Sequence, residues 1–342
     1  MDPVTHGLLG GAAAQTISKH PRMAAAVGLV TAPLADLDIL IRSSDDPLLS
    51  LEYHRQFTHA LVFIPLGALI GALLLWPFVR KQTTPGRLYG LTLAAYATAG
   101  LLDACTSYGT HLLWPFTGNP VAWNLIAVVD PVFTLSLLCG VAAACYWRRS
   151  GWARIGLAVA LAYLALGAVQ HHRALAVAED LALARNLHPE RLIVKPTMAN
   201  LVLWRSVTVA DGNAYADAIR VGLPGNTRVY QGESTQLVEP DRWGGLPEGS
   251  RAYRDLHRFH RFADGFLAVH PNDRNFVGDL RYALLPTSVA PLWGVVVDRN
   301  NPDRAVDFVT KRKLTPAKRQ DFVRMLRGRS PGTGHENPGA GR

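Results

Sequence analysis

The chain is poor in cysteine, and its first half is poor in charge. Three of the 342 residues are cysteines, none lies in the second half, and no CxxC pair occurs. This excludes a disulfide scaffold and a cysteine-ligated zinc motif, while the cellular compartment stays open. Residues 1–170 contain only 10 Lys or Arg and 8 Asp or Glu, whereas residues 171–342 contain 25 and 18. A uniform soluble globule, a disordered chain and a repeat array are therefore excluded.

Long apolar runs occupy the charge-poor half. Leu61–Val79 is an uncharged stretch of 19 residues, about the length that crosses a bilayer core, and two basic residues follow it. Residues 125–147 form a longer run with one charge, and residues 88–102 and 155–169 reach spanning length with weakly polar flanks. So many runs in so few residues predict membrane spans rather than the core helices of a soluble protein.

The first 41 residues are predicted to form a short helical hairpin. They lack the basic start and the strongly apolar centre of a signal peptide. Helices over residues 3–18 and 22–41 would flank a basic turn. The excess of Lys and Arg in this turn, near residues 80–87 and near residues 148–154 predicts that these loops are cytoplasmic. About six helices would then cross or enter the membrane, starting from the outside.

The second half is predicted to form mainly β-strands rather than membrane spans. We predict a connecting helix over residues 171–190, a small antiparallel β-rich extramembrane domain over 191–310, and a basic helix with a disordered tail over 311–342. The fold class is therefore α+β, with a polytopic transmembrane helical bundle in residues 1–170. Short strands are expected at 202–210, 214–221, 227–230, 266–270, 275–284 and 292–297, with a hairpin turn at Asp211-Gly212-Asn213 between the first two. The basic helix is expected to start at Thr315-Pro316 and to end at Gly328. His257 and His260 are expected on the surface or in the sheet. The disordered tail is expected over residues 329–342, which are rich in Gly, Pro and Arg.

Ionisable residues of the first half are predicted to gather at the outer ends of the helices. The residues placed there are His6, Asp36, Asp38, His54, Arg55, His59, Asp103, His111 and Asp130. The basic loops alone set the topology, so this convergence is an independent check on it. Ionisable groups at membrane depth cost several kcal/mol unless they are paired or solvated, which makes them functional candidates.

Imidazoles and carboxylates without thiols form a nitrogen and oxygen ligand set. Such a set suits Zn²⁺, Mn²⁺, iron or Mg²⁺, and its size allows two ions. Each residue also has a structural reading: His6 could cap its helix, Asp36 and Asp38 could be a loop pair, and Asp130-Pro131 could be a kink in a helix that begins near Asn124. Thr58 is expected to cap the helix that starts at His59.

Four segments carry a resemblance to a known family. They are residues 1–7 (MDPVTHG), 33–38 (PLADLD), 54–59 (HRQFTH) and 103–110 (DACTSYGT). The chain resembles the YdjM/YbcI-like predicted membrane-bound metal-dependent hydrolases over roughly residues 1–170, and more loosely through residues 200–205 (NLVLWR). The resemblance implies a polytopic inner-membrane protein with a hydrolase site, and no particular substrate. A remoter likeness to the phospholipase C/P1 nuclease group favours phosphoester cleavage.

The leading hypothesis is a metal-dependent hydrolase that acts on an ester or phosphoester bond of a lipid-like or envelope substrate. His6, Asp36, His54, His59 and Asp103 would bind a divalent metal, with zinc expected first and manganese or iron as alternatives. Asp38 would orient a ligand or act as general base. Arg55 would steady an anionic substrate or be a plain loop cation. The β-rich domain is expected on the outer, periplasmic side of a bacterial-type inner membrane.

Two other functions stay open. A proton or metal-ion transporter would use the same cluster, but it requires polar residues through the bilayer depth, and the later helices have almost none. A non-catalytic membrane scaffold would leave the HRQFTH segment without a purpose. The net charge of +9 comes mostly from the second half. We interpret it as a solvated surface with a basic tail, so no nucleic-acid partner is favoured.

Overall fold

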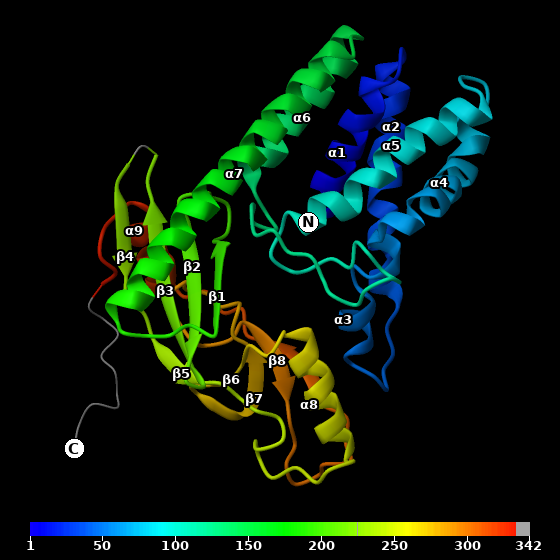
Figure 1. The fold of residues 1–342 in the computed structure, drawn as a ribbon. Coiled ribbons are helices and arrows are strands. Elements are labelled where there is room, and N and C mark those ends of the chain that lie inside the picture. Colours follow the sequence, from blue (N-terminus) through cyan, green and yellow to red (C-terminus); the bar gives the residue numbers. More distant parts are fainter. Residues whose placement is uncertain (224, 333–342) are drawn as a thin grey trace. The chain divides into compact units, whose positions relative to one another are not determined.

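The computed structural model describes residues 1–332 apart from residue 224, and these residues form two compact units. Unit 1 consists of Met1–Ser44, Leu49–Val169 and Met198–Leu201. Unit 2 consists of Asp45–Leu48, Gln170–Thr197 and the described residues from Val202 onward. The fold is a mixture of helices and sheets, as predicted (Figure 1). Residues 333–342 of the predicted tail lie outside the described residues.

Unit 1 is helical. Its elements are α1 (Pro3–Thr16), α2 (Pro21–Thr31), the 3-10 helix η1 (Ala32–Leu40), α3 (Leu49–Tyr53), the 3-10 helices η2 (Phe57–His59) and η3 (Leu61–Phe63), α4 (Ile64–Val79), α5 (Pro85–Ala104), α6 (Pro131–Trp147) and the first part of α7 (Gly151–Ala184). Proline stands in the first turn of α1, α2, α4, α5 and α6, where its missing N–H removes no helical hydrogen bond.

Three segments of the described chain are long and apolar enough to cross a membrane. They are Pro21–Leu40, Leu61–Val79 and Gly151–Ala184. Helix α6 is apolar but shorter, with 17 residues. Three of the predicted spans therefore have the length and composition that crossing requires, and the arrangement of about six helices stays a prediction.

The start of α6 differs from the sequence prediction. A helix was expected from near Asn124, with a kink at Asp130-Pro131 as one interpretation, but the helix begins at Pro131. The Asp130 carboxylate accepts hydrogen bonds from the backbone N–H groups of Val132 and Phe133, at 3.0 and 3.2 Å. Asp130 is thus an N-cap, and the preceding apolar residues are not helical because the cap and the proline fix the helix start behind them.

Small residues let the helices of unit 1 approach closely. A Cβ atom added to Gly28 of α2 would lie 2.3 Å from the Gly10 carbonyl oxygen of α1, so these two helices cross backbone to backbone. A Cβ atom added to Gly100 of α5 would lie 2.2 Å from the His59 carbonyl oxygen. Gly100 therefore allows α5 to pass directly against η2, three residues before Asp103.

Unit 2 contains two antiparallel sheets. The five-stranded sheet has the order β1-β2-β3-β4, with β5 also paired to β3, and comprises β1 (Arg191–Pro196), β2 (Leu203–Ala210), β3 (Asn213–Val221), β4 (Thr227–Tyr230) and β5 (Ser234–Gln236). The four-stranded sheet has the order β6-β7-β8-β9 and comprises β6 (Leu267–His270), β7 (Asp273–Asp279), β8 (Trp293–Val296) and β9 (Asp307–Thr310). The predicted hairpin is present: Ala210 pairs with Asn213, and Asp211 and Gly212 both have positive φ.

Both faces of β2 are covered, which explains its buried pattern. On one face Trp204 packs with Ala174 and Ala178 of α7. On the other face Val207 and Val209 pack with residues of the four-stranded sheet and its flanks. Helix α9 (Pro316–Leu326) covers the rest of this face, and it starts at the Thr315 cap and ends before Gly328, as predicted.

Helix α8 (Arg251–Phe262) was missed from the sequence. Its buried residues Ala252, Asp255, Leu256 and Phe259 recur with helical spacing, but arginines and histidines fill the positions between them. His257 and His260 were expected on the surface or in the sheet, and they lie on this helix. Strands β1, β5 and β9 were also missed, while α7 runs without a break through residues predicted as a span and as a connecting helix.

Candidate metal site

Four elements far apart in the sequence place the side chains of the site. His6 lies in the first turn of α1, which Asp2 caps by accepting a hydrogen bond from the Thr5 N–H at 3.0 Å. Asp36 and Asp38 lie on η1, His59 lies on η2, and Asp103 lies in the last turn of α5. All four elements belong to unit 1.

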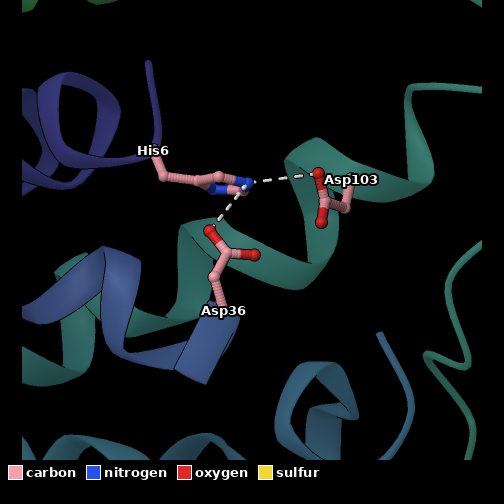
Figure 2. Close-up of side chains that lie close together, drawn as sticks. All are labelled: His6, Asp36 and Asp103. Atoms are coloured by element: carbon pink, nitrogen blue, oxygen red, sulfur yellow. Dashed lines mark hydrogen bonds and ion pairs between the residues drawn. The ribbon is translucent and has the colours of Figure 1, made fainter. Parts of the chain in front are cut away.

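His6, Asp36 and Asp103 form the centre of the site. The His6 Nε2 atom lies 3.1 Å from Asp103 Oδ1 and 3.9 Å from Asp36 Oδ2 (Figure 2). One ligand atom from each residue can be chosen so that all three lie within 4.8 Å of one another. His6 and Asp103 have no exposed surface, and the Asp36 side chain is 17% exposed. This spacing is compatible with a shared cation.

His59 approaches the same two carboxylates. Its Nε2 atom lies 3.4 Å from Asp36 Oδ1 and 3.3 Å from Asp103 Oδ2. Within the described part of the chain, His59 Nε2, Asp36 Oδ2 and Asp103 Oδ2 are buried and make no hydrogen bond. Buried polar atoms in proteins almost always have partners, so atoms without one, directed at a common point, require an explanation such as an ion.

Asp38 contacts His59 on the Nδ1 side of the ring, away from the central carboxylates. Its Oδ2 atom lies 3.3 Å from His59 Nδ1 and accepts hydrogen bonds from the Thr58 hydroxyl at 2.7 Å and the Arg55 N–H at 2.8 Å. Its Oδ1 atom lies 2.8 Å from His54 Nδ1. A carboxylate behind one imidazole nitrogen fixes the orientation of the ring and leaves the other nitrogen to face the site.

Arg55 supplies the positive charge next to the carboxylates. Its Nε atom lies 2.9 Å from Asp103 Oδ2, and its Nη1 donates to the Thr106 hydroxyl at 3.0 Å. Its backbone has φ 62°, in the left-handed region that a residue with a side chain rarely adopts. Such strain is maintained when the surroundings fix the residue, here by Asp38 and Thr106. The Met1 amino group also contacts Asp103.

The pKa of His59 reflects this surplus of carboxylates. Burial lowers the pKa of the imidazole, but the neighbouring carboxylates of Asp103, Asp36 and Asp38 outweigh burial and raise the pKa to about 10. In the absence of a cation, His59 therefore holds a proton at neutral pH. A cation that used Nε2 as a ligand would displace this proton.

The structure brings some of the predicted site residues together and separates others. His6, Asp36, His59 and Asp103 converge, whereas His54 contacts Asp38 instead of the central group, and its side chain is 21% exposed. His111 donates its backbone N–H to the Arg55 carbonyl, and Asp130 caps α6.

Three supporting side chains were not recognised from the sequence. Thr58, expected as a helix cap, lies inside η2 and donates its hydroxyl to Asp38. The Tyr96 hydroxyl donates to the Thr58 carbonyl at 3.0 Å, and Thr106 accepts from Arg55. The position of Thr58 within the HRQFTH segment was the one available signal. Thr106 had a similar signal, since it lies in the DACTSYGT segment, whereas Tyr96 had none because it reaches the site only through the packing of α5.

The donor set fits a divalent cation. Asp36, Asp38 and Asp103 carry three negative charges, Arg55 carries one positive charge, and imidazole and carboxylate atoms are ordinary ligands of zinc, manganese and iron. The identity of a metal does not follow from this set.

Comparison with known proteins shows which family the chain belongs to. The family described as YdjM inner membrane protein matches residues 1–174. The chain belongs to the YdjM inner membrane protein family. The matched residues include every side chain of the candidate site, from His6 to Asp103. Together with the three apolar segments, membership of the YdjM family supports a membrane location.

One curated relative extends the similarity beyond the first unit. The chain is 28% identical over 226 residues to the uncharacterized protein YfhP of Bacillus subtilis (strain 168), and the match covers 61% of this chain and 66% of the relative. The chain thus spans about two thirds of the length of this relative. No solved structure matches the chain.

Proposed function

We propose that this YdjM family member is a membrane-bound, metal-dependent hydrolase that cleaves an ester or phosphoester bond of a lipid-like or envelope substrate. The observation that carries the proposal is the convergence of His6, His59, Asp36 and Asp103, with buried atoms that lack hydrogen bonds within the described residues. A polar group buried without a partner costs roughly 1–3 kcal/mol. A bound cation would remove this cost.

The residues of the site would have different roles. His6, Asp36, Asp103 and His59 would hold the cation, and Asp38 would keep the His59 ring in place. A divalent cation supplies Lewis-acid polarisation of the scissile group and lowers the pKa of water. Arg55 neutralises part of the carboxylate charge, and it would help to hold an anionic substrate. His54, bound to Asp38 and partly exposed, would take a supporting position.

A lipid-like substrate is favoured by where the site lies along the chain. Asp36 lies near the end of the candidate span Pro21–Leu40, and His59 comes just before the candidate span Leu61–Val79. Successive spans run in opposite directions, so the end of one and the start of the next lie at the same membrane surface. The proposed site would therefore lie at the membrane–water interface, where a lipid head group is accessible.

The loop between these spans supports an outer location for the β-rich part. Asp45–Leu48 belongs to unit 2, where the Asp46 carboxylate receives two hydrogen bonds from Arg258 at 2.9 and 3.0 Å, and Arg251 donates to the Asp45 carbonyl at 2.9 Å. This loop carries no basic excess, which favours the outer side of an inner membrane. We propose that the β-rich part lies on the same side as the loop.

Elemental analysis of protein purified in detergent tests the metal site. Wild type should contain a transition metal, and His59→Ala and Asp103→Ala should lose most of it because each removes a proposed ligand. His172→Ala, which changes an exposed histidine of α7, is the matched control and should retain the metal. Equal metal content in all four proteins, or none in any, would contradict the proposal.

Hydrolysis is tested separately. Chromogenic carboxylic esters, phosphomonoesters and phosphodiesters with acyl chains, presented in mixed micelles, should reveal which bond is cleaved. Chelation should abolish turnover, and metal replacement should restore it. Metal-loaded protein that cleaves none of these substrates would favour the non-catalytic scaffold.

A further inference from the structure

We propose that the site holds two divalent cations, and that the second one lies between His59 and the two carboxylates. This inference rests on the proposed metal-dependent function. It concerns the number of ions, which neither the family description nor the three-residue group of His6, Asp36 and Asp103 specifies.

The oxygens of both central carboxylates are divided between the two imidazoles. Asp103 directs Oδ1 to His6 Nε2 at 3.1 Å and Oδ2 to His59 Nε2 at 3.3 Å. Asp36 directs Oδ2 to His6 Nε2 at 3.9 Å and Oδ1 to His59 Nε2 at 3.4 Å. Each carboxylate thus spans the space between the two rings. A carboxylate that bridges two cations uses its oxygens in this way, one for each ion.

The contacts therefore fall into two sets. One set contains His6 Nε2, Asp103 Oδ1 and Asp36 Oδ2, and the other contains His59 Nε2, Asp103 Oδ2 and Asp36 Oδ1. With metal–ligand bonds of about 2.0–2.2 Å, neighbouring ligand atoms of one ion lie roughly 3–3.5 Å apart. Three of the four distances fall in this range, and the contact of Asp36 with His6 exceeds it by a few tenths of an ångström.

His59 has the properties of a ligand in its own right. The residue is 2% exposed, and its Nε2 atom makes no hydrogen bond within the described chain. Its Nδ1 atom lies against Asp38 and the Thr58 hydroxyl, so the ring cannot satisfy Nε2 by turning without losing these contacts. Metal-bound histidines commonly have such a partner behind the ring.

Arg55 does not block the second position. Its Nε atom lies 2.9 Å from Asp103 Oδ2, yet neither atom forms a hydrogen bond of good geometry. An ionised carboxylate oxygen has more than one lone pair, so Oδ2 can serve both a cation and the guanidinium group. The cation would lie on the side of Oδ2 that faces His59.

The charge balance then predicts an anionic substrate. Three carboxylates and the Arg55 guanidinium group give a net charge of −2 with neutral imidazoles, and a protonated Met1 amino group on Asp103 makes it −1. Two divalent ions would exceed this charge by two or three positive charges. A phosphoester would supply the missing negative charge, whereas a neutral carboxylic ester would not. The two-ion arrangement therefore favours phosphoester cleavage, for which paired ions about 3.5–4 Å apart are suited.

Manganese reconstitution tests the inference without measuring activity. Wild-type protein, stripped and reloaded with Mn²⁺ in detergent, should bind about two ions per chain and give the paramagnetic resonance spectrum of a coupled pair. His59→Ala and His6→Ala should each bind about one ion and give the spectrum of an isolated ion. His172→Ala should behave as wild type.

The outcomes separate the two proposals. About one ion per wild-type chain, with an isolated-ion spectrum, would overturn the second site and leave the metal-dependent function intact. No bound manganese and no native metal would overturn both. Because the wild-type stoichiometry decides the question by itself, a variant that fails to fold does not affect the test. His59→Gln serves as a second variant, since it keeps the size and removes the imidazole.

Discussion

Buried charged side chains occur in both units, but they are satisfied in different ways. In unit 2, Arg205 of β2 donates hydrogen bonds to the backbone carbonyls of Leu280, Pro286 and Ser288 at 2.7–2.9 Å. Arg281 pairs with the Asp279 carboxylate at 2.8 Å. In unit 1, by contrast, His59 Nε2 and Asp103 Oδ2 are buried without a hydrogen bond among the described residues.

The difference shows that burial of charge does not by itself mark a functional site. Arg205 links β2 to the loop between β7 and β8 through backbone carbonyls, and the charge of Arg281 is balanced by the Asp279 carboxylate. Two buried groups of Arg and Lys side chains in unit 2 depart from this pattern: the Nε atom of Arg205 and the amine of Lys195 make no hydrogen bond among the described residues. The Lys195 amine lies 3.1 Å from the centre of the Tyr282 ring. Burial holds the pKa of this amine well below its ordinary value and so favours the neutral form. The site of unit 1 instead keeps several charges directed at one point.

The largest effect is expected from Asp279→Asn in unit 2. Removing one member of a buried ion pair leaves Arg281 uncompensated and should destabilise the fold by about 3–5 kcal/mol. Thermal unfolding in detergent measures the loss, and the metal content of the protein that remains folded should equal that of wild type. Metal loss in this variant would break the distinction between the two regions.

Asp36→Asn should have the opposite effects: a large loss of metal binding and little loss of stability. It removes a charged ligand, and because loss of a supporting residue alone weakens metal binding about 10–100-fold, loss of a ligand should weaken it by more than about a hundredfold. The partly exposed side chain should leave the unfolding temperature of the metal-free protein almost unchanged. Competition with a chromogenic chelator measures the affinity, and Asp180→Asn, on an exposed position of α7, is the control.

Gly100→Ala tests whether close packing creates the site. The new methyl group would lie 2.2 Å from the His59 carbonyl oxygen, which should move α5 from η2 and destabilise the protein by about 1–3 kcal/mol. Metal affinity should fall with it, because Asp103 moves relative to His59. Gly90→Ala in the same helix meets nothing within 4 Å, so it should be neutral or stabilise by up to about 1 kcal/mol. Equal behaviour of the two variants would rule out the packing argument.

The smallest effect concerns Asp46, which pairs with Arg258 in unit 2. Burial raises the pKa of this carboxyl group, but the hydrogen bonds and charge of Arg258 outweigh burial and hold the pKa below its ordinary value. The pair therefore stabilises the protein above about pH 4, and this contribution is lost as pH falls through the lowered pKa. Solvent screening limits it to at most about 1 kcal/mol. The difference in unfolding temperature between Asp46→Asn and wild type should be present at neutral pH and vanish in acid.

Several elements of the fold follow from local patterns that can be recognised in the sequence. The hairpin around Asp211-Gly212 and the start of α9 at Thr315-Pro316 depend on residues adjacent in the chain, so both were predicted. Helix α8 was not predicted, because its three buried apolar residues are separated by charged residues and histidines. The start of α6 was placed too early, because apolar character alone does not distinguish a helix from the extended segment before its cap.

The sequence allowed the converging residues to be selected, but it also predicted His54 as a ligand, and it did not predict the geometry. His6, Asp36, His59 and Asp103 could be selected because ionisable residues are costly near apolar spans. The same argument could not predict that Asp38 contacts the Nδ1 atom of His59, or that His54 contacts Asp38. Asp36 and Asp38 are two residues apart, and their contacts with opposite nitrogens of one ring depend on the 3-10 conformation of η1.

The sequence by itself determined that one half of this protein is apolar and the other charged, and which residues in the apolar half carry ionisable groups. Only the tertiary structure decided which of those groups meet. His6 and Asp103 are separated by 97 positions, and their contact exists because α1, η1, η2 and α5 pack closely at small residues. Composition is a property of the chain, whereas a distance of a few ångströms between remote side chains is set by packing.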